Sequence, residues 1–187
     1  MGGHPGQRGF RDRILDDATV VPRAGAPGVP PTAMNKRRVR WDEHAGAQAN
    51  AQRHLPPLVA EYFATVRDFL AKDPAPPKLH CLRLATKRLR YTLELFRPCY
   101  GPALDTRLAA LRQVQQLLGE VNDCAAAWRL LSAAMNPSPQ RTRVKHYLER
   151  QAQAKAQEFR RHWAEVFDAP GQEQGWVAYF ARNARHQ

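Results

Sequence analysis

The sequence predicts an all-α protein, an antiparallel bundle of four to five helices with short connections. Three observations support this fold class. Apolar residues recur at intervals of three and four in several long segments, which is the period of a helix. Clusters of Pro and Gly separate these segments, as expected at helix ends. No segment shows the sustained alternation of apolar and polar residues that is typical of a half-buried strand.

Composition divides the chain into three regions. Residues 1–40 are basic and rich in Gly and Pro, with little periodicity, and we expect them to be a disordered extension. Within this extension, Met34 precedes a basic run and is our candidate for the true start of the chain. Residues 41–169 carry the helical periodicity. Residues 170–187 form a tail with clustered aromatic side chains, which we expect to cover either the bundle or a partner.

The first two helices of the bundle are predicted from their Pro boundaries. Residues 56–72 form the first, with Pro56 and Pro57 in its first turn, where a missing N–H costs nothing; a start further back, near Asp42, is the alternative. A Pro-rich segment ends this helix, and the second helix then occupies residues 79–96.

The remaining helices follow the same pattern. A third helix over residues 103–119 is expected to end at a polar interruption, where Asn122 or Asp123 caps a fourth helix that extends to residue 135. Residues 140–168 are predicted to form one long last helix.

The helix over residues 79–96 carries two neighbouring stripes when its residues are placed about 100° apart. The apolar stripe has the spacing of a core face. The basic stripe places cationic groups about 4.5 to 6 Å apart along the axis, which suits an anion with many closely spaced charges. The apolar stripe consists of Leu79, Leu82, Thr86, Leu89, Leu93 and Phe96, and the basic stripe of His80, Arg83, Lys87, Arg90, Tyr91 and Glu94.

The overall composition agrees with a polyanionic partner. The formal net charge is +12 and the isoelectric point about 10.4, which favours nucleic acid, polyphosphate or an acidic membrane surface, although an Arg-rich solvated surface is the simpler explanation. Three cysteines without CxxC spacing indicate small buried thiols in a reduced, cytoplasmic protein. No apolar run is long enough to span a bilayer, and the histidines show no metal-binding spacing.

Two sequence motifs resemble those of a known family. The run His80-x-x-Arg83-x-x-x-Lys87-Arg88-Leu89-Arg90-Tyr91-x-x-Glu94 is similar to the signature helix of the CHAD family, the conserved histidine α-helical domain. The run Leu117-Leu118-Gly119-x-x-Asn122-Asp123 resembles the turn after the next helix of that family. The resemblance covers roughly residues 56–168 and implies an all-helical domain that binds inorganic polyphosphate through basic residues facing a central channel.

The resemblance also bears on assembly and activity. Members of the family usually contain two four-helix halves around a pseudo-twofold axis, whereas this chain has one signature helix and corresponds to one half. We therefore expect a homodimer that rebuilds the two-bundle arrangement. The alternating Glu and Lys strand motif of the triphosphate-tunnel enzymes that often accompany the family is absent, so no catalysis and no cofactor are expected.

Candidate ligands follow from side-chain chemistry. Arg83 and Arg90 are the first choices because guanidinium groups match phosphate oxygens, and Lys87 adds a mobile charge between them. A bound phosphate chain favours the imidazolium form of His80, so we expect binding to tighten as the pH falls toward 6. Arg88 points away from the basic stripe, so a surface role is as well supported as ligand contact. The second-tier candidates on the last helix are Arg143, His146 and Arg150.

Structural roles are predicted for two further residues of the basic stripe. Glu94 is expected to hold the guanidinium of Arg90 across one turn, and the ring of Tyr91 is expected to be buried at the edge of the bundle.

The leading hypothesis is thus a cytoplasmic, non-catalytic polyphosphate-binding module, with targeting to polyphosphate granules as one use. The first alternative is a nucleic-acid-binding helical protein, for which the basic stripe offers few stacking groups. The second alternative is a helical dimerisation scaffold without a small ligand.

Overall fold

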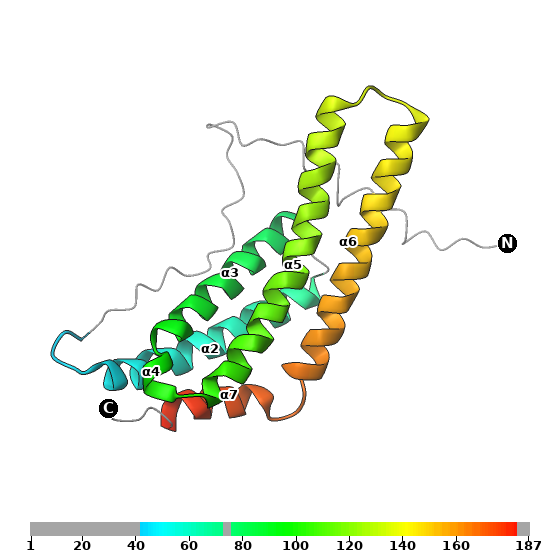
Figure 1. The fold of residues 1–187 in the computed structure, drawn as a ribbon. Coiled ribbons are helices and arrows are strands. Elements are labelled where there is room, and N and C mark those ends of the chain that lie inside the picture. Colours follow the sequence, from blue (N-terminus) through cyan, green and yellow to red (C-terminus); the bar gives the residue numbers. More distant parts are fainter. Residues whose placement is uncertain (1–41, 73–75, 183–187) are drawn as a thin grey trace.

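The computed structural model describes residues 42–72 and 76–182, with the side chains of residues 76–78 left out. Within these ranges the chain forms helices and no strands, which confirms the all-α prediction (Figure 1). The helices are α2 (Ala47–Ala71), α3 (Pro76–Leu95), α4 (Arg97–Tyr100), α5 (Ala103–Ala134), α6 (Pro139–Val166) and α7 (Gln172–Arg182). The predicted extension, residues 1–40, lies outside the described residues.

The two longest helices organise the bundle. Helices α5 and α6 form an antiparallel hairpin that extends past the other helices, and α3 lies against α5 on the side away from α6 (Figure 1). Helix α2 packs on α3 and on α7. Helix α5 therefore separates α3 from α6, which decides which basic residues share a surface.

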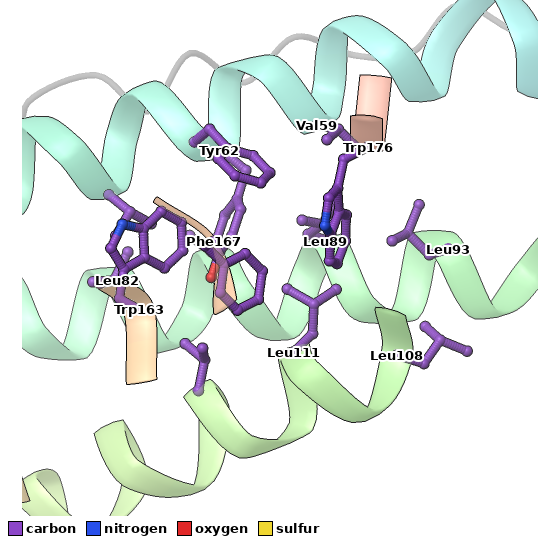
Figure 2. Packing of buried hydrophobic residues seen from close by; sticks show 14 of the residues in the cluster. Val59, Tyr62, Leu82, Leu89, Leu93, Leu108, Leu111, Trp163, Phe167 and Trp176 are labelled. Carbon is purple, nitrogen blue, oxygen red and sulfur yellow. The ribbon is translucent and has the colours of Figure 1, made fainter. Parts of the chain in front are cut away.

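The apolar stripe of α3 is buried at all six predicted positions. Figure 2 shows Leu82, Leu89 and Leu93 between Val59 and Tyr62 of α2 on one side and the leucines of α5 on the other. Since burial of each such side chain contributes about 1.5–3 kcal/mol, this stripe determines how α3 is rotated about its axis.

Aromatic side chains fill the core between α2, α6 and α7. Trp163 and Phe167 stack with ring centroids 4.6 Å apart, and Phe63 of α2 lies 5.5 Å from Trp163. Trp176 of α7 is 5.3 Å from Phe167, which ties the last helix to the end of α6. These rings are buried, so α7 completes the core of the bundle.

Helix α2 begins at Ala47, so the placement of Pro56 and Pro57 in a first turn is wrong. Both prolines lie inside the helix, at the expense of two intrahelical hydrogen bonds. The additional turns are stabilised by burial, because Ala51 and Leu55 are fully enclosed. Buried Asn50 secures the start, as its side-chain amide donates to the Asp42 carbonyl (3.0 Å) and its oxygen accepts from the Asp42 amide (3.0 Å).

Helix α5 is continuous from Ala103 to Ala134, so the predicted interruption at residues 119–123 is wrong. The amide of Asn122 does not cap a new helix; it donates to the carbonyl of Leu118 one turn back (3.0 Å). Glu120 forms an ion pair with Lys155 of α6 (3.0 Å), and Val121 is buried. A glycine inside a helix costs about 1 kcal/mol relative to alanine, and packing against α6 outweighs this cost at Gly119.

The aromatic tail covers the body of the bundle, one of its two expected positions. Trp176, Tyr179 and Phe180 are buried on α7, and the Tyr100 hydroxyl donates to the Phe180 carbonyl (2.8 Å). The cysteines are free, but only Cys99 is buried; Cys81 is exposed, contrary to the expectation of buried thiols. Residue 81 lies on the side of α3 that no described helix covers.

One buried hydrogen bond joins α2 to α3. The hydroxyls of Tyr62 and Thr86 are 3.0 Å apart, and Thr86 donates its proton to the Leu82 carbonyl (2.9 Å). Tyr62 is therefore the donor to Thr86. Burial raises the pKa of Tyr62, outweighing the opposite effect of this hydrogen bond, so the phenol stays neutral.

We expect Tyr62→Phe to lower the free energy of unfolding by about 1 kcal/mol, since Thr86 keeps its bond to Leu82. Thr86→Val should cost more, about 1–3 kcal/mol, because it leaves the buried Tyr62 hydroxyl without a partner. Urea denaturation measures both values.

The double variant Tyr62→Phe/Thr86→Val should be more stable than Thr86→Val alone; equal stability would contradict the assigned donor. Alkaline pH gives a second readout. As pH rises above about 10, the unfolded chain loses the Tyr62 proton before the folded chain does, so the free energy of unfolding of the wild type falls. The part of this fall that is due to Tyr62 should be absent in Tyr62→Phe.

Candidate functional site

The cationic side chains of the basic stripe lie on α3 beside α5. Because the apolar stripe faces the core, Arg83, Lys87 and Arg90 come to the edge of α3 and are partly buried, while His80 is exposed. The helical rise places Arg83 and Arg90 about 10 Å apart along the axis. The predicted stripe is thus a continuous feature of the surface.

Arg90 is the most firmly held cation of the stripe. Its Nε donates to the side-chain oxygen of Gln115 on α5 (3.0 Å), and its guanidinium carbon lies 4.3 Å from the centre of the Tyr91 ring. Its Nη1 donates to Glu94 Oε1 (2.6 Å), which confirms the expected pair across one turn. Only 13% of the Arg90 side chain is exposed.

Arg112 of α5 joins the same carboxylate. Its Nη2 lies 3.2 Å from Glu94 Oε1, the atom that also receives Arg90. Arg112 was not among the ligands predicted from the sequence. No sequence motif marks Arg112, and only the antiparallel packing of α5 on α3 brings it to Glu94.

Arg83 lies toward the other end of the stripe, one turn after His80, and over a glycine of α5. Its Nε is buried without a hydrogen-bond partner among the described residues. A Cβ added at Gly119 of α5 would lie 3.5 Å from this nitrogen. The Leu-Leu-Gly motif therefore marks the close approach of Arg83 to α5 and not the turn that the resemblance implied.

The charges of Arg83 and Lys87 are not neutralised within the part of the chain that the structure describes. Neither side chain has a carboxylate within ion-pair distance there, although the Lys87 ammonium lies 5.5 Å from the centre of the Tyr91 ring. The stripe is therefore uncompensated at Arg83 and Lys87 and compensated by Glu94 at Arg90.

Tyr91 is 46% exposed, so its expected burial is wrong. Position 91 lies on the outer side of α3, away from the apolar stripe, and no described helix covers it. The ring is instead flanked by the cations of Arg90 and Lys87. Cation–π contact of this kind offsets part of the repulsion between neighbouring positive charges.

The other predicted ligands lie apart from this surface. Arg88 is exposed on α3, on the side away from α5. Arg143, His146 and Arg150 are exposed on α6, and α5 stands between them and α3. His146 is also 3.1 Å from the buried carboxylate of Glu149. The structure does not bring the α6 residues to the basic stripe.

Two other cations are committed to structural contacts. The guanidinium of Arg107 lies 3.7 Å from the centre of the Tyr179 ring, and burial lowers its pKa. Lys155 bridges Glu120 and Glu158 at 3.0 Å each, and its hydrogen bond to Glu120 is the main reason that its pKa is raised. Neither is available to a ligand without loss of these contacts.

Two other features are absent from the described residues. Residues 42–72 and 76–182 contain no group of three or more His, Cys, Asp or Glu side chains able to hold a metal ion. Among the helices of these same ranges, none combines the length and the apolar character needed to cross a membrane.

Comparison with known proteins identifies the family. The family model described as CHAD domain matches residues 13–132, which is more than half of the 187 residues. The chain therefore belongs to the CHAD domain family. The matched span includes α2 to most of α5, and so the whole basic stripe and Arg112, but not α6. No curated protein and no solved structure matches the chain.

The contact between Arg83 and Gly119 gives a prediction. Gly119→Ala should raise the free energy of unfolding by about 0.5–1 kcal/mol, because alanine favours the helix and its Cβ makes an ordinary contact with Arg83. Gly119→Leu should push the Arg83 side chain away from α5. Urea denaturation and binding of heparin, a model polyanion, measure the two effects.

Heparin affinity should be retained in Gly119→Ala and should fall several-fold in Gly119→Leu. Equal affinity of the two variants would show that the position of Arg83 over α5 is unimportant for anion binding.

Proposed function

We propose that this protein binds inorganic polyphosphate without catalysing a reaction, on the surface that α3 and α5 form together. The observation that carries the proposal is the basic stripe itself, in which Arg83, Lys87 and Arg90 follow one another along one edge of α3. Arg112 from α5 extends it. The CHAD family is associated with polyphosphate binding in general, which supports the choice of ligand.

The chemistry of each group suits a linear polyphosphate. The guanidinium of Arg83 can donate to phosphate oxygens in a fork, and its charge has no carboxylate partner among the described residues. Lys87 contributes a compact charge on a flexible stem. His80 lies at the exposed start of the stripe, one turn before Arg83.

The proposed biological setting is the cytoplasm, where such binding would place the protein on polyphosphate granules. The proposed ligand and the free cysteines support this setting.

Nucleic acid is the second candidate because Tyr91 is exposed and could stack on a base. Its ring already lies 4.3 Å from the guanidinium carbon of Arg90, which occupies one of the positions that a base would take. A phosphate chain needs no stacking surface, so we rank polyphosphate first.

The test compares binding of long polyphosphate by wild type and by Arg83→Ala/Arg90→Ala. Loss of two phosphate contacts should weaken binding by about 100-fold or more at low salt, since each charged contact contributes about 1.5–3 kcal/mol. The matched control is Arg53→Ala/Arg67→Ala, which removes the same charge from two arginines of α2 that pair with Asp42 and with Glu173 of α7. Equal weakening of both variants would indicate attraction by net charge alone.

Competition distinguishes the two ligands. Long polyphosphate should displace single-stranded DNA of matched charge, and the DNA should fail to displace polyphosphate. The opposite order would favour nucleic acid. Arg143→Ala/Arg150→Ala tests α6 in the same assay, and a loss comparable to that of Arg83→Ala/Arg90→Ala would extend the site around the bundle.

We further propose that two chains pair across α3. Leu84, Tyr91 and Leu95 are 42%, 46% and 75% exposed, and their spacing puts them on one side of α3, next to the basic stripe. An isologous contact through this face would bury them and bring two basic stripes together, where one polyphosphate chain could touch both.

Light scattering at micromolar concentration tests the pairing. Wild type should behave as a dimer, and Leu84→Glu/Leu95→Glu as a monomer. Leu130→Glu, at another exposed leucine, is the matched control and should remain dimeric. A monomeric wild type, with and without polyphosphate, would contradict the proposal.

A further inference from the structure

Glu94 is the one acidic side chain within the basic stripe, and two cations converge on one of its oxygens. Arg90 Nη1 lies 2.6 Å from Glu94 Oε1, and Arg112 Nη2 lies 3.2 Å from the same atom. The two guanidinium groups come from different helices. An anionic oxygen held between two guanidinium groups is also the arrangement that a bound phosphate would have.

Arg90 has two contacts besides its ion pair with Glu94. Gln115 Oε1 accepts from Arg90 Nε at 3.0 Å, and the Tyr91 ring lies 4.3 Å from its guanidinium carbon. Both contacts are with uncharged groups and would remain if Glu94 turned away. The carboxylate is therefore one of three groups that position this arginine.

Glu94 is also open to exchange. Its side chain is 29% exposed and that of Arg112 is 55% exposed, so an external anion can reach the point where the two cations meet. The Arg112–Glu94 ion pair contributes little net stability at this degree of exposure, because water competes for both partners. The Arg90 side chain is only 13% exposed, so a ligand oxygen replaces the carboxylate at a small cost at Arg112 and at a larger cost at Arg90.

We propose that Glu94 is a built-in competing anion, which occupies the Arg90–Arg112 end of the site until a polyanion bound at Arg83 and Lys87 displaces it. The inference rests on the proposed function, and it assigns Arg112 to the same site. Arg83 and Lys87 carry charges that no described carboxylate compensates, so they are the end at which an anion binds first.

This arrangement selects long chains. A chain already held at Arg83 and Lys87 presents its next phosphates to Glu94 at an effective concentration in about the millimolar range. A separate short anion must compete with the carboxylate from its bulk concentration. Glu94 therefore acts as a specificity residue by opposing the wrong ligand, and not by contacting the right one.

The experiment measures binding of long polyphosphate and of tripolyphosphate to wild type, Glu94→Gln, Arg112→Gln and the double variant. Glu94→Gln should bind long polyphosphate at least about fivefold more tightly, since the exposed pair with Arg112 and the less exposed pair with Arg90 no longer have to be broken. Its affinity should fall more steeply with salt, by about 0.7–0.9 in the slope of log K against log salt for the added contact.

Two further results are expected. Tripolyphosphate should gain an Arg112-dependent site in Glu94→Gln that wild type lacks. The double variant should lose most of the gain for both ligands. The matched control is Glu173→Gln, which removes the same charge from an Arg–Glu pair between α7 and α2 and should leave affinity within about twofold of wild type.

Weaker binding by Glu94→Gln at an unchanged salt slope would overturn the inference and make Glu94 a positioning residue for Arg90. Unchanged binding would overturn it as well. Failure of the proposed function is distinguishable, because it appears as absence of polyphosphate binding in wild type. Heparin then serves as the second polyanion, and a gain by Glu94→Gln toward heparin would support the competing role independently of phosphate.

Discussion

Burial of the apolar stripe of α3 is the constraint on which the rest of the structure depends. Leu82, Leu89 and Leu93 fill the space between α2 and α5, so they determine the rotation of α3 about its axis (Figure 2). The basic stripe follows on the adjacent face because residues three and four apart share a side of a helix. The hydrophobic core thus places the charges, although no cation lies in the core itself.

The packed helices also make the clustering of positive charge tolerable. Neighbouring cations repel one another, and the described structure offsets this at Arg90 with Glu94, Gln115 and the ring of Tyr91. Arg83 and Lys87 lack a carboxylate partner in the described part of the chain. The site is therefore asymmetric along α3, with a preorganised arginine at one end and unneutralised charges at the other.

Helix bounds predicted from the sequence are close to those observed where the apolar period repeats over several turns. They are wrong where tertiary packing outweighs local helix-breaking residues. The helix of residues 79–96 was predicted closely because its two stripes repeat over several turns. The prolines at 56 and 57 and the Gly119–Asn122 segment are local helix breakers, yet both lie inside helices. Burial of Leu55 in one case and contact with α6 in the other outweighs a local preference of a few kcal/mol.

The sequence by itself determined the all-α class, the family and the order of charges along α3, because these depend on spacing within one continuous helix. Only the tertiary structure decided which other groups share the surface. It brought Arg112 and Gln115 to Arg90, kept Arg143 and Arg150 apart behind α5, and left Tyr91 exposed. The physical reason is that helix packing sets contacts between segments distant in sequence, and spacing along one segment carries no record of them.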